Sequence, residues 1–327
     1  MFRRAIRLFA IGAMLVNAGT GFAPTSRAQS AGTFTLPNSV LLFQEDVPRP
    51  PYLELLVVSN TGAVEVPPPG DYRGTAYTTA FPAISPLADL LAWQLSRHDE
   101  SRKERIKSVL GIFSIADKTW KTFGDFCGES IGWVAFSPDG TKVAFASKPA
   151  VASRDGYCFE NATVLQVLDI ATGKLTPIRY SGRIDANARL TWSPDGKYLA
   201  GQYCCTNPST NQIVLIDLAS DSGKAIAEGT NPSWSPKGDW ISLEDQKGKE
   251  CILARPDGTG AKVVQKLQGD LMFLKGAMWS PDGEKLLFDE EAIDSDGNVS
   301  ILDLPSGRIT KQPKHTEFVL GWASQFR

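Results

Sequence analysis

A short motif that recurs at long intervals constrains the fold of this chain more than any other feature. Four segments read alike, each with a Ser-Pro-Asp-Gly or Ser-Pro-Lys-Gly core between two apolar runs: 134–146, 190–200, 232–242 and 277–288. A fifth segment, 81–92, keeps Ser-Pro but lacks the polar residue and Gly that follow. The motif serines stand at 85, 137, 193, 235 and 280, which places them 42 to 56 residues apart. A repeat of this period that contains several short strands is typical of the blades of a β-propeller.

The chemistry of the motif favours a tight turn between two antiparallel strands. Proline fixes φ at the first corner, Asp suits the second, and Gly accepts the positive φ that completes the turn. The flanking apolar, aromatic and β-branched residues prefer strands. A third strand ending in Asp follows most motifs, as at 164–169, and then a fourth, as at 174–179. We therefore predict four antiparallel strands in each repeat, and we interpret Asp139, Asp195 and Asp282 as turn residues.

Both ends of the chain complete the count of repeats. Residues 40–44, 52–59 and 63–66 read as three strands without a first one, and 318–324 reads as a first strand without successors. Joined, they form one blade that closes the ring without exposing sheet edges. The fold prediction is all-β, a six-bladed propeller of four-stranded antiparallel blades over 39–327. Trp192, Trp234 and Trp279 share one repeat position, and we expect them to pack between neighbouring blades.

The Trp-Ser-Pro-Asp-Gly copies resemble the WD40-like repeats of TolB-like propellers, and the resemblance covers roughly residues 35–327. It implies a six-bladed propeller of the bacterial envelope. TolB carries an α/β domain before its propeller, and this chain has no counterpart of that domain. The resemblance therefore implies a fold more specifically than a function.

The N-terminal segment is predicted to be a signal peptide at 1–28, followed by a linker at 29–38. Arg3, Arg4 and Arg7 form a positive start, a short apolar run follows at 8–16, and small residues precede the cleavage point after Ala28. The apolar run is too short to span a membrane, and no later run reaches the required length. We expect a periplasmic or secreted protein without a membrane span.

Charge and histidine content exclude other classes of protein. With 34 basic and 36 acidic residues the formal net charge is −2, which argues against binding to nucleic acid. The chain has two histidines, His98 and His315, too few for a multi-histidine metal site. We predict no catalytic residue, no cofactor and no metal, and we expect a monomer.

Function is predicted to lie on the face that carries the long connections between strands, because variable loops on a rigid scaffold usually bind partners. On that face we expect a protein or peptide partner from the envelope. The residues expected on its loops are Asp71, Arg73, Asp125, Glu129, Arg183, Asp185, Asp270, His315 and Glu317.

Two alternatives stay open at this point. One is a propeller enzyme or a protein that binds a small ligand or sugar at the central channel. The other concerns calcium, because Asp294 and Asp296 form a short acidic loop near Glu290 and Glu291.

Five cysteines in an exported chain suggest two disulfides and one spare thiol. Cys127 and Cys158 belong to connections on the same face of one blade, so we predict a bridge between them. Cys251 is expected to pair with Cys205 or Cys204, and the sequence does not decide which.

Overall fold

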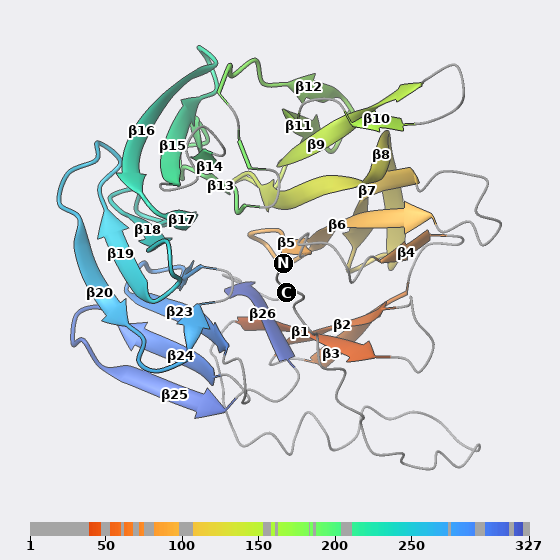
Figure 1. The fold of residues 1–327 in the computed structure, drawn as a ribbon. Coiled ribbons are helices and arrows are strands. Elements are labelled where there is room, and N and C mark those ends of the chain that lie inside the picture. Colours follow the sequence, from red (N-terminus) through yellow and green to blue (C-terminus); the bar gives the residue numbers. More distant parts are fainter. Residues whose placement is uncertain are drawn as a thin grey trace, which may run out of the picture. The chain divides into compact units, whose positions relative to one another are not determined.

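Strands and tight turns make up the computed structural model, with no helix in the part of the chain that it describes (Figure 1). The described residues are 39–46, 53–59, 62–67, 72–74, 82–97, 107–152, 158–160, 163–182, 184–185, 188–203, 211–273, 276–291, 298–313 and 317–322. The chain divides into two compact units, Met1–Phe34 and Thr35–Arg327. The predicted signal peptide and linker lie outside the described residues. Over these ranges, no helix is long and apolar enough to cross a membrane.

Five antiparallel sheets contain the described strands, and the largest holds two repeats. That sheet has the order β12-β11-β9-β8-β7-β6-β4, and β5 and β10 pair with β6 and β9 beside this path. Its strands are β4 Tyr72–Gly74, β5 Ala83–Ile84, β6 Leu90–Arg97, β7 Lys107–Ser114, β8 Thr119–Phe136, β9 Lys142–Ala152, β10 Cys158–Glu160, β11 Val164–Asp169 and β12 Leu175–Pro177.

The next three sheets follow the chain, one repeat in each. The first contains β13 Thr191–Trp192, β14 Tyr198–Tyr203, β15 Gln212–Asp217 and β16 Ser222–Glu228. The second contains β17 Thr230–Trp234, β18 Ile241–Glu244, β19 Glu250–Ala254 and β20 Lys262–Lys266. The third contains β21 Met272–Phe273, β22 Met278–Trp279, β23 Lys285–Glu291, β24 Asn298–Asp303 and β25 Ile309–Pro313.

The remaining sheet joins the two ends of the second unit, as predicted. Its order is β26-β1-β2-β3, formed by Glu317–Trp322, Ser39–Asp46, Leu53–Ser59 and Gly62–Val66. β26 pairs with β1 in antiparallel register, with Phe318 opposite Leu42. The closing blade built from both ends is therefore confirmed.

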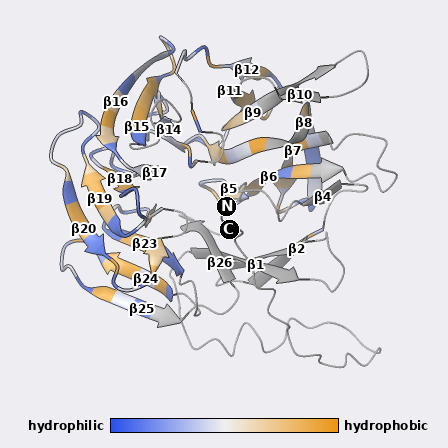
Figure 2. Ribbon diagram, in the orientation of Figure 1, coloured by the Kyte–Doolittle hydropathy of each residue, from blue (hydrophilic) through white to orange (hydrophobic). Residues whose placement is uncertain are grey.

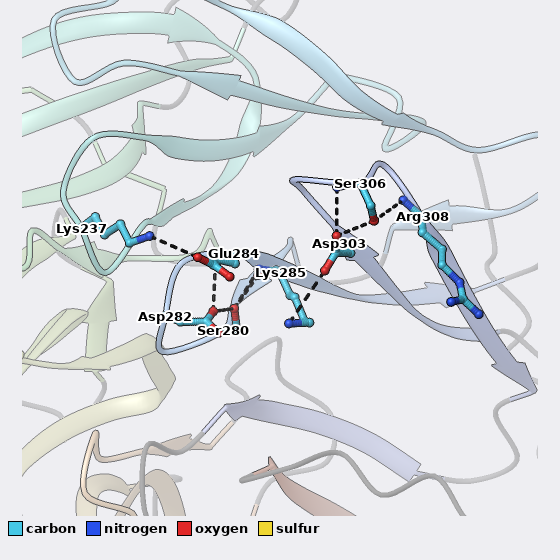
Figure 3. Close-up of polar contacts among 8 residues, drawn as sticks. All are labelled: Lys237, Ser280, Asp282, Glu284, Lys285, Asp303, Ser306 and Arg308. Carbon is cyan, nitrogen blue, oxygen red and sulfur yellow. Dashed lines mark hydrogen bonds and ion pairs between the residues drawn. The ribbon is translucent and has the colours of Figure 1, made fainter.

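The motif forms the predicted turn, and the serine side chain stabilises it by hydrogen bonds that were not predicted. In the turn at Ser280, the serine Oγ donates to Asp282 Oδ1 at 2.5 Å and accepts from the Lys285 backbone N–H at 2.8 Å (Figure 3). Gly283 has a φ of +70°, within one degree of the φ of its counterparts Gly140 and Gly196, and this conformation favours glycine. Each turn thus satisfies its own polar groups locally.

Neighbouring sheets pack together through apolar side chains. Figure 2 shows hydrophobic residues along strands such as β15 and β19. Ile213, Trp234 and Ile241 belong to one buried cluster drawn from two successive repeats. Each fully buried side chain of this size contributes about 1.5–3 kcal/mol. Two of the motif tryptophans also bond across the interface, because Trp192 Nε1 donates to Ala135 O at 2.9 Å and Trp279 Nε1 to Ser233 O at 3.0 Å.

The first strands of the repeats contact one another in sequence. β5 contacts β8, β8 contacts β13, β13 contacts β17, β17 contacts β22, β22 contacts β26, and β26 contacts β5. This closed cycle is the order expected of a propeller whose blades follow the chain. The count of six blades agrees with the cycle and stays a prediction.

One predicted loop is a strand. Asp125 and Glu129, which were expected on a loop, lie within β8, which runs from the outer strand of one repeat into the inner strand of the next. The register of β8 shifts between Phe126 and Ile131 and again between Ile131 and Val134. Such bulges bend a strand and raise its twist, so a single strand can serve two blades.

Candidate functional site

The residues expected on the long-loop face fall into three groups. We use "long-loop face" for the strand ends opposite the motif turns, and "turn face" for the ends that carry those turns. Asp125 and Asp270 are exposed and Asp185 is half-buried. Arg73 and Glu317 lie on β4 and β26 rather than in loops, and Glu129 lies on β8, as does Asp125. Asp71, Arg183 and His315 lie outside the described residues.

A buried carboxylate that the sequence did not single out lies at the same end of the strands. Glu244 is the last residue of β18, and 2% of it is exposed. Its Oε2 accepts a hydrogen bond from Asn231 Nδ2 at 2.7 Å, and its Oε1 accepts one from the Gly276 backbone N–H at 2.7 Å. These bonds connect two successive repeats through one side chain.

A third repeat reaches the same place through an arginine. Arg189 precedes β13, and its Nη1 donates to Ala277 O at 3.0 Å, across 88 positions of sequence. A Cβ added at Gly276 would lie 3.2 Å from the same Nη1 atom. We call Arg189, Asn231, Glu244 and Gly276 the Glu244 cluster.

The backbone of this cluster adopts conformations that most residues avoid. Asn231 has a φ of +51° and Gly276 a φ of +81°. A Cβ at Gly276 would lie 2.8 Å from Asn231 O, so glycine is required there by both conformation and space. Residues held in sparsely populated conformations gather at ligand sites and other functional sites, which makes the cluster a candidate.

Burial shifts the acid-base behaviour of both charged groups. Loss of solvent raises the pKa of Glu244 to about 7, although the bonds from Asn231 and Gly276 and the charge of Arg189 lower it. Burial likewise lowers the pKa of Arg189 to about 10, against the opposing effect of Glu244. Pairs of perturbed ionisable groups are enriched at functional sites, and structural ion pairs show them as well.

The repeat alignment contains the signal that would have found the cluster. The residue nine positions after each motif serine is Gln94, Ala146, Gln202, Glu244 or Asp289, and all five are buried. The residue four positions before the last three motif serines is Arg189, Asn231 or Gly276. Polar residues at core positions of a strand are the departure from pattern that marks this site.

Among the five cysteines, the side chain of Cys251 is the one that the structure describes. Cys251 is buried and its thiol is free in the structure, in contrast with the expected bridge, and burial raises the pKa of that thiol. Cys204 and Cys205 lie outside the described residues. Cys127 and Cys158 lie on β8 and β10, both of which pair with β9, and their side chains are not described. The Cys127–Cys158 bridge stays a prediction.

Glu290, one of the carboxylates near the predicted calcium loop, is not available as a calcium ligand in the structure. Glu290 is fully buried, accepts from Ser300 Oγ at 2.5 Å, and contacts Lys311 Nζ at 2.9 Å. A carboxylate paired with a lysine is a poor ligand for a cation. Asp294 and Asp296 lie outside the described residues. In the described ranges, no three His, Cys, Asp or Glu residues gather in a group that could hold a metal ion.

Comparison with solved structures identifies the fold. TolB from Acinetobacter baumannii matches 87% of this chain with a TM-score of 0.62 and 17% identity, and the match covers 66% of that protein, just under two thirds. A chain of the nidogen/laminin complex matches 84% of this chain, with a TM-score of 0.55, 12% identity and 92% of its own length.

Oligogalacturonate lyase in complex with manganese also matches, over 85% of this chain and 74% of its own, with a TM-score of 0.55 and 16% identity. No family model matches the sequence, and no curated protein matches it. At these identities the likeness concerns the fold alone. The chain has a TolB-like β-propeller fold.

Proposed function

We propose that this protein is an exported binding or scaffold protein of the bacterial envelope. It binds a protein or peptide partner through the long-loop face and catalyses no reaction. The TolB-like fold supports this proposal at the level of fold, and the contrast between the two faces supports the choice of surface.

The observation that carries the proposal is the Glu244 cluster. Arg189, Asn231 and Gly276 each stand just before or within the first strand of a different repeat, and the cluster ties these three positions together. A buried hydrogen-bond network of this kind restricts the positions of the loops beside it, which lowers the entropy lost on binding. The turn face uses its carboxylates inside its own turns.

An enzyme is the competing reading, and one of the similar structures is named as a lyase in complex with manganese. Catalysis in a propeller of that kind needs a metal or a group of convergent acids and bases near the channel. Elemental analysis of the purified protein separates the two readings. A tightly held ion in stoichiometric amount supports the enzyme and contradicts our proposal.

Affinity capture from an envelope extract tests the proposal directly. The bait is compared with a long-loop variant, Asp125→Lys with Asp270→Lys, and with a turn-face variant, Asp257→Lys with Glu284→Lys. All four side chains are exposed, and both variants change the net charge equally. We expect the first variant to lose the partner and the second to keep it, and the reverse result contradicts the proposal.

A further inference from the structure

The interface between the two repeats of the largest sheet contains four buried polar side chains. Gln94 lies on β6, Ser108 on β7, Ser147 on β9 and Gln166 on β11. Three of them are completely buried, and 8% of Gln166 is exposed. None of the four carries a charge, so the group offers neutral donors and acceptors.

Register places these side chains on two faces that pack together. Gln94 lies opposite Leu110 and two positions after Ala92, and Ser147 lies two positions after Phe145. Ala92, Leu110 and Phe145 belong to a single buried cluster. Because residues two apart on a strand share a face, Gln94 and Ser147 both face this interface.

Hydrogen bonding within the group is unequal. Gln166 Nε2 donates to Ser147 Oγ at 2.6 Å, which gives each of these side chains a partner. Both amide atoms of Gln94 and the Oγ atom of Ser108 are buried without a hydrogen-bond partner. Such groups are rare in native proteins, and ordered water normally supplies the missing bonds.

The backbone beside the group supplies further polar atoms. Phe126 and Ile131 belong to the same buried cluster, and between them the pairing of β8 with β9 shifts register. A bulge leaves backbone groups without partners in the ladder. The interface thus combines an orphaned amide, an orphaned hydroxyl and an interrupted strand pairing.

We propose that this interface holds an internal water site between Gln94 and Ser108. The water donates to Gln94 Oε1 or accepts from Gln94 Nε2, and it exchanges a hydrogen bond with the Ser108 hydroxyl. Water fits because it can donate and accept at once, whereas an ion would meet no opposite charge among the four side chains.

Substitution gives a test whose two outcomes differ in sign. Gln94→Met keeps the approximate volume and removes both polar atoms. If water fills the site, the variant removes one hydrogen-bond partner of the water that also binds the Ser108 hydroxyl. We then expect the equilibrium constant for unfolding in urea to rise about tenfold. If the site is dry, the variant removes an unsatisfied group and the constant falls, which overturns the proposal.

Two further variants sharpen this result. Gln202→Met changes the same residue type at the same repeat position, where the amide atoms are not orphaned, and it sets the scale for the change of shape. Ser108→Ala is combined with Gln94→Met. If the two side chains share a water, the double variant raises the equilibrium constant for unfolding by much less than the product of the two single increases. Effects that simply multiply contradict a shared water.

A crystal structure of the unmodified protein decides the matter even where a variant fails to fold. We expect an ordered water within hydrogen-bond distance of the Gln94 amide and of Ser108 Oγ. An empty interface, a Gln94 amide bonded to protein groups alone, or a bound species other than water overturns the proposal.

Discussion

Carboxylates on the two faces of this propeller behave in opposite ways. On the turn face, Asp195 accepts from Ser193 Oγ at 2.6 Å and from the Lys197 backbone N–H at 3.1 Å, and these bonds lower its pKa. At the other end of the strands, Glu244 also accepts two hydrogen bonds, yet burial raises its pKa to about 7. The difference is solvent, because Asp195 is exposed and Glu244 is not.

The two groups also differ in where their partners come from. The bonds of Asp195 lie within two positions of sequence, and the same arrangement recurs at Asp139 and Asp282. The bonds of Glu244 come from residues 13 and 32 positions away. Local and repeated interactions build the motif turns, whereas the Glu244 cluster joins three repeats through non-local contacts.

Ring closure is the most extreme non-local interaction, and breaking it has the largest expected effect. Deletion of residues 318–327 removes β26 and exposes the edge of β1. We expect a loss of about 5 kcal/mol or more, which is comparable with the whole stability of many domains. Thermal unfolding measures it. A truncated protein that melts within about 2 °C of the full chain contradicts the role of β26.

Replacing Glu244 by Gln is expected to change how stability depends on pH. A carboxyl whose pKa rises on folding contributes stability that is complete below its unfolded pKa, near 4.5, and is lost as the pH rises to about 7. The raised pKa corresponds to about 3 kcal/mol. Urea unfolding between pH 4 and pH 8 should therefore show a decline in the wild type that is smaller in Glu244→Gln. Parallel curves contradict the burial effect.

Replacing a glycine of positive φ by alanine on each face compares how tightly the two faces are packed. Gly276→Ala places a Cβ 2.8 Å from Asn231 O, whereas Gly196→Ala on the turn face meets nothing within 4 Å. We expect a loss of about 2–3 kcal/mol at Gly276 and about 1 kcal/mol at Gly196, the latter from conformation alone. Equal losses in urea unfolding imply that the Glu244 cluster is not tightly packed.

The smallest expected effect concerns a single motif turn. Ser193→Ala removes the hydroxyl that donates to Asp195 and accepts from the Tyr198 backbone N–H at 2.9 Å. We expect a loss of about 1 kcal/mol, measured by urea unfolding at neutral pH. The bond lowers the pKa of Asp195, so this stability is present above the unfolded pKa and disappears as the pH falls below it. A difference in the free energy of unfolding between variant and wild type that grows as the pH falls contradicts this prediction.

Sequence patterns predicted the parts of the fold whose causes are local. The Ser-Pro-Asp-Gly turns, the strands beside them and the closing blade all follow from residues within one repeat or from what each end of the chain lacks. The path of β8 was missed because bulges carry little local signal. The Glu244 cluster was missed because three repeats contribute only one or two residues each to it, and proximity across 88 positions depends on how the blades assemble.

Photocrosslinking in cells tests most directly whether a partner binds the long-loop face. A photoreactive amino acid replaces Asp270, or Lys197 on the turn face, and both side chains are exposed. We expect a crosslinked partner from position 270 and none from position 197. A partner that crosslinks from 197 and not from 270 would contradict it.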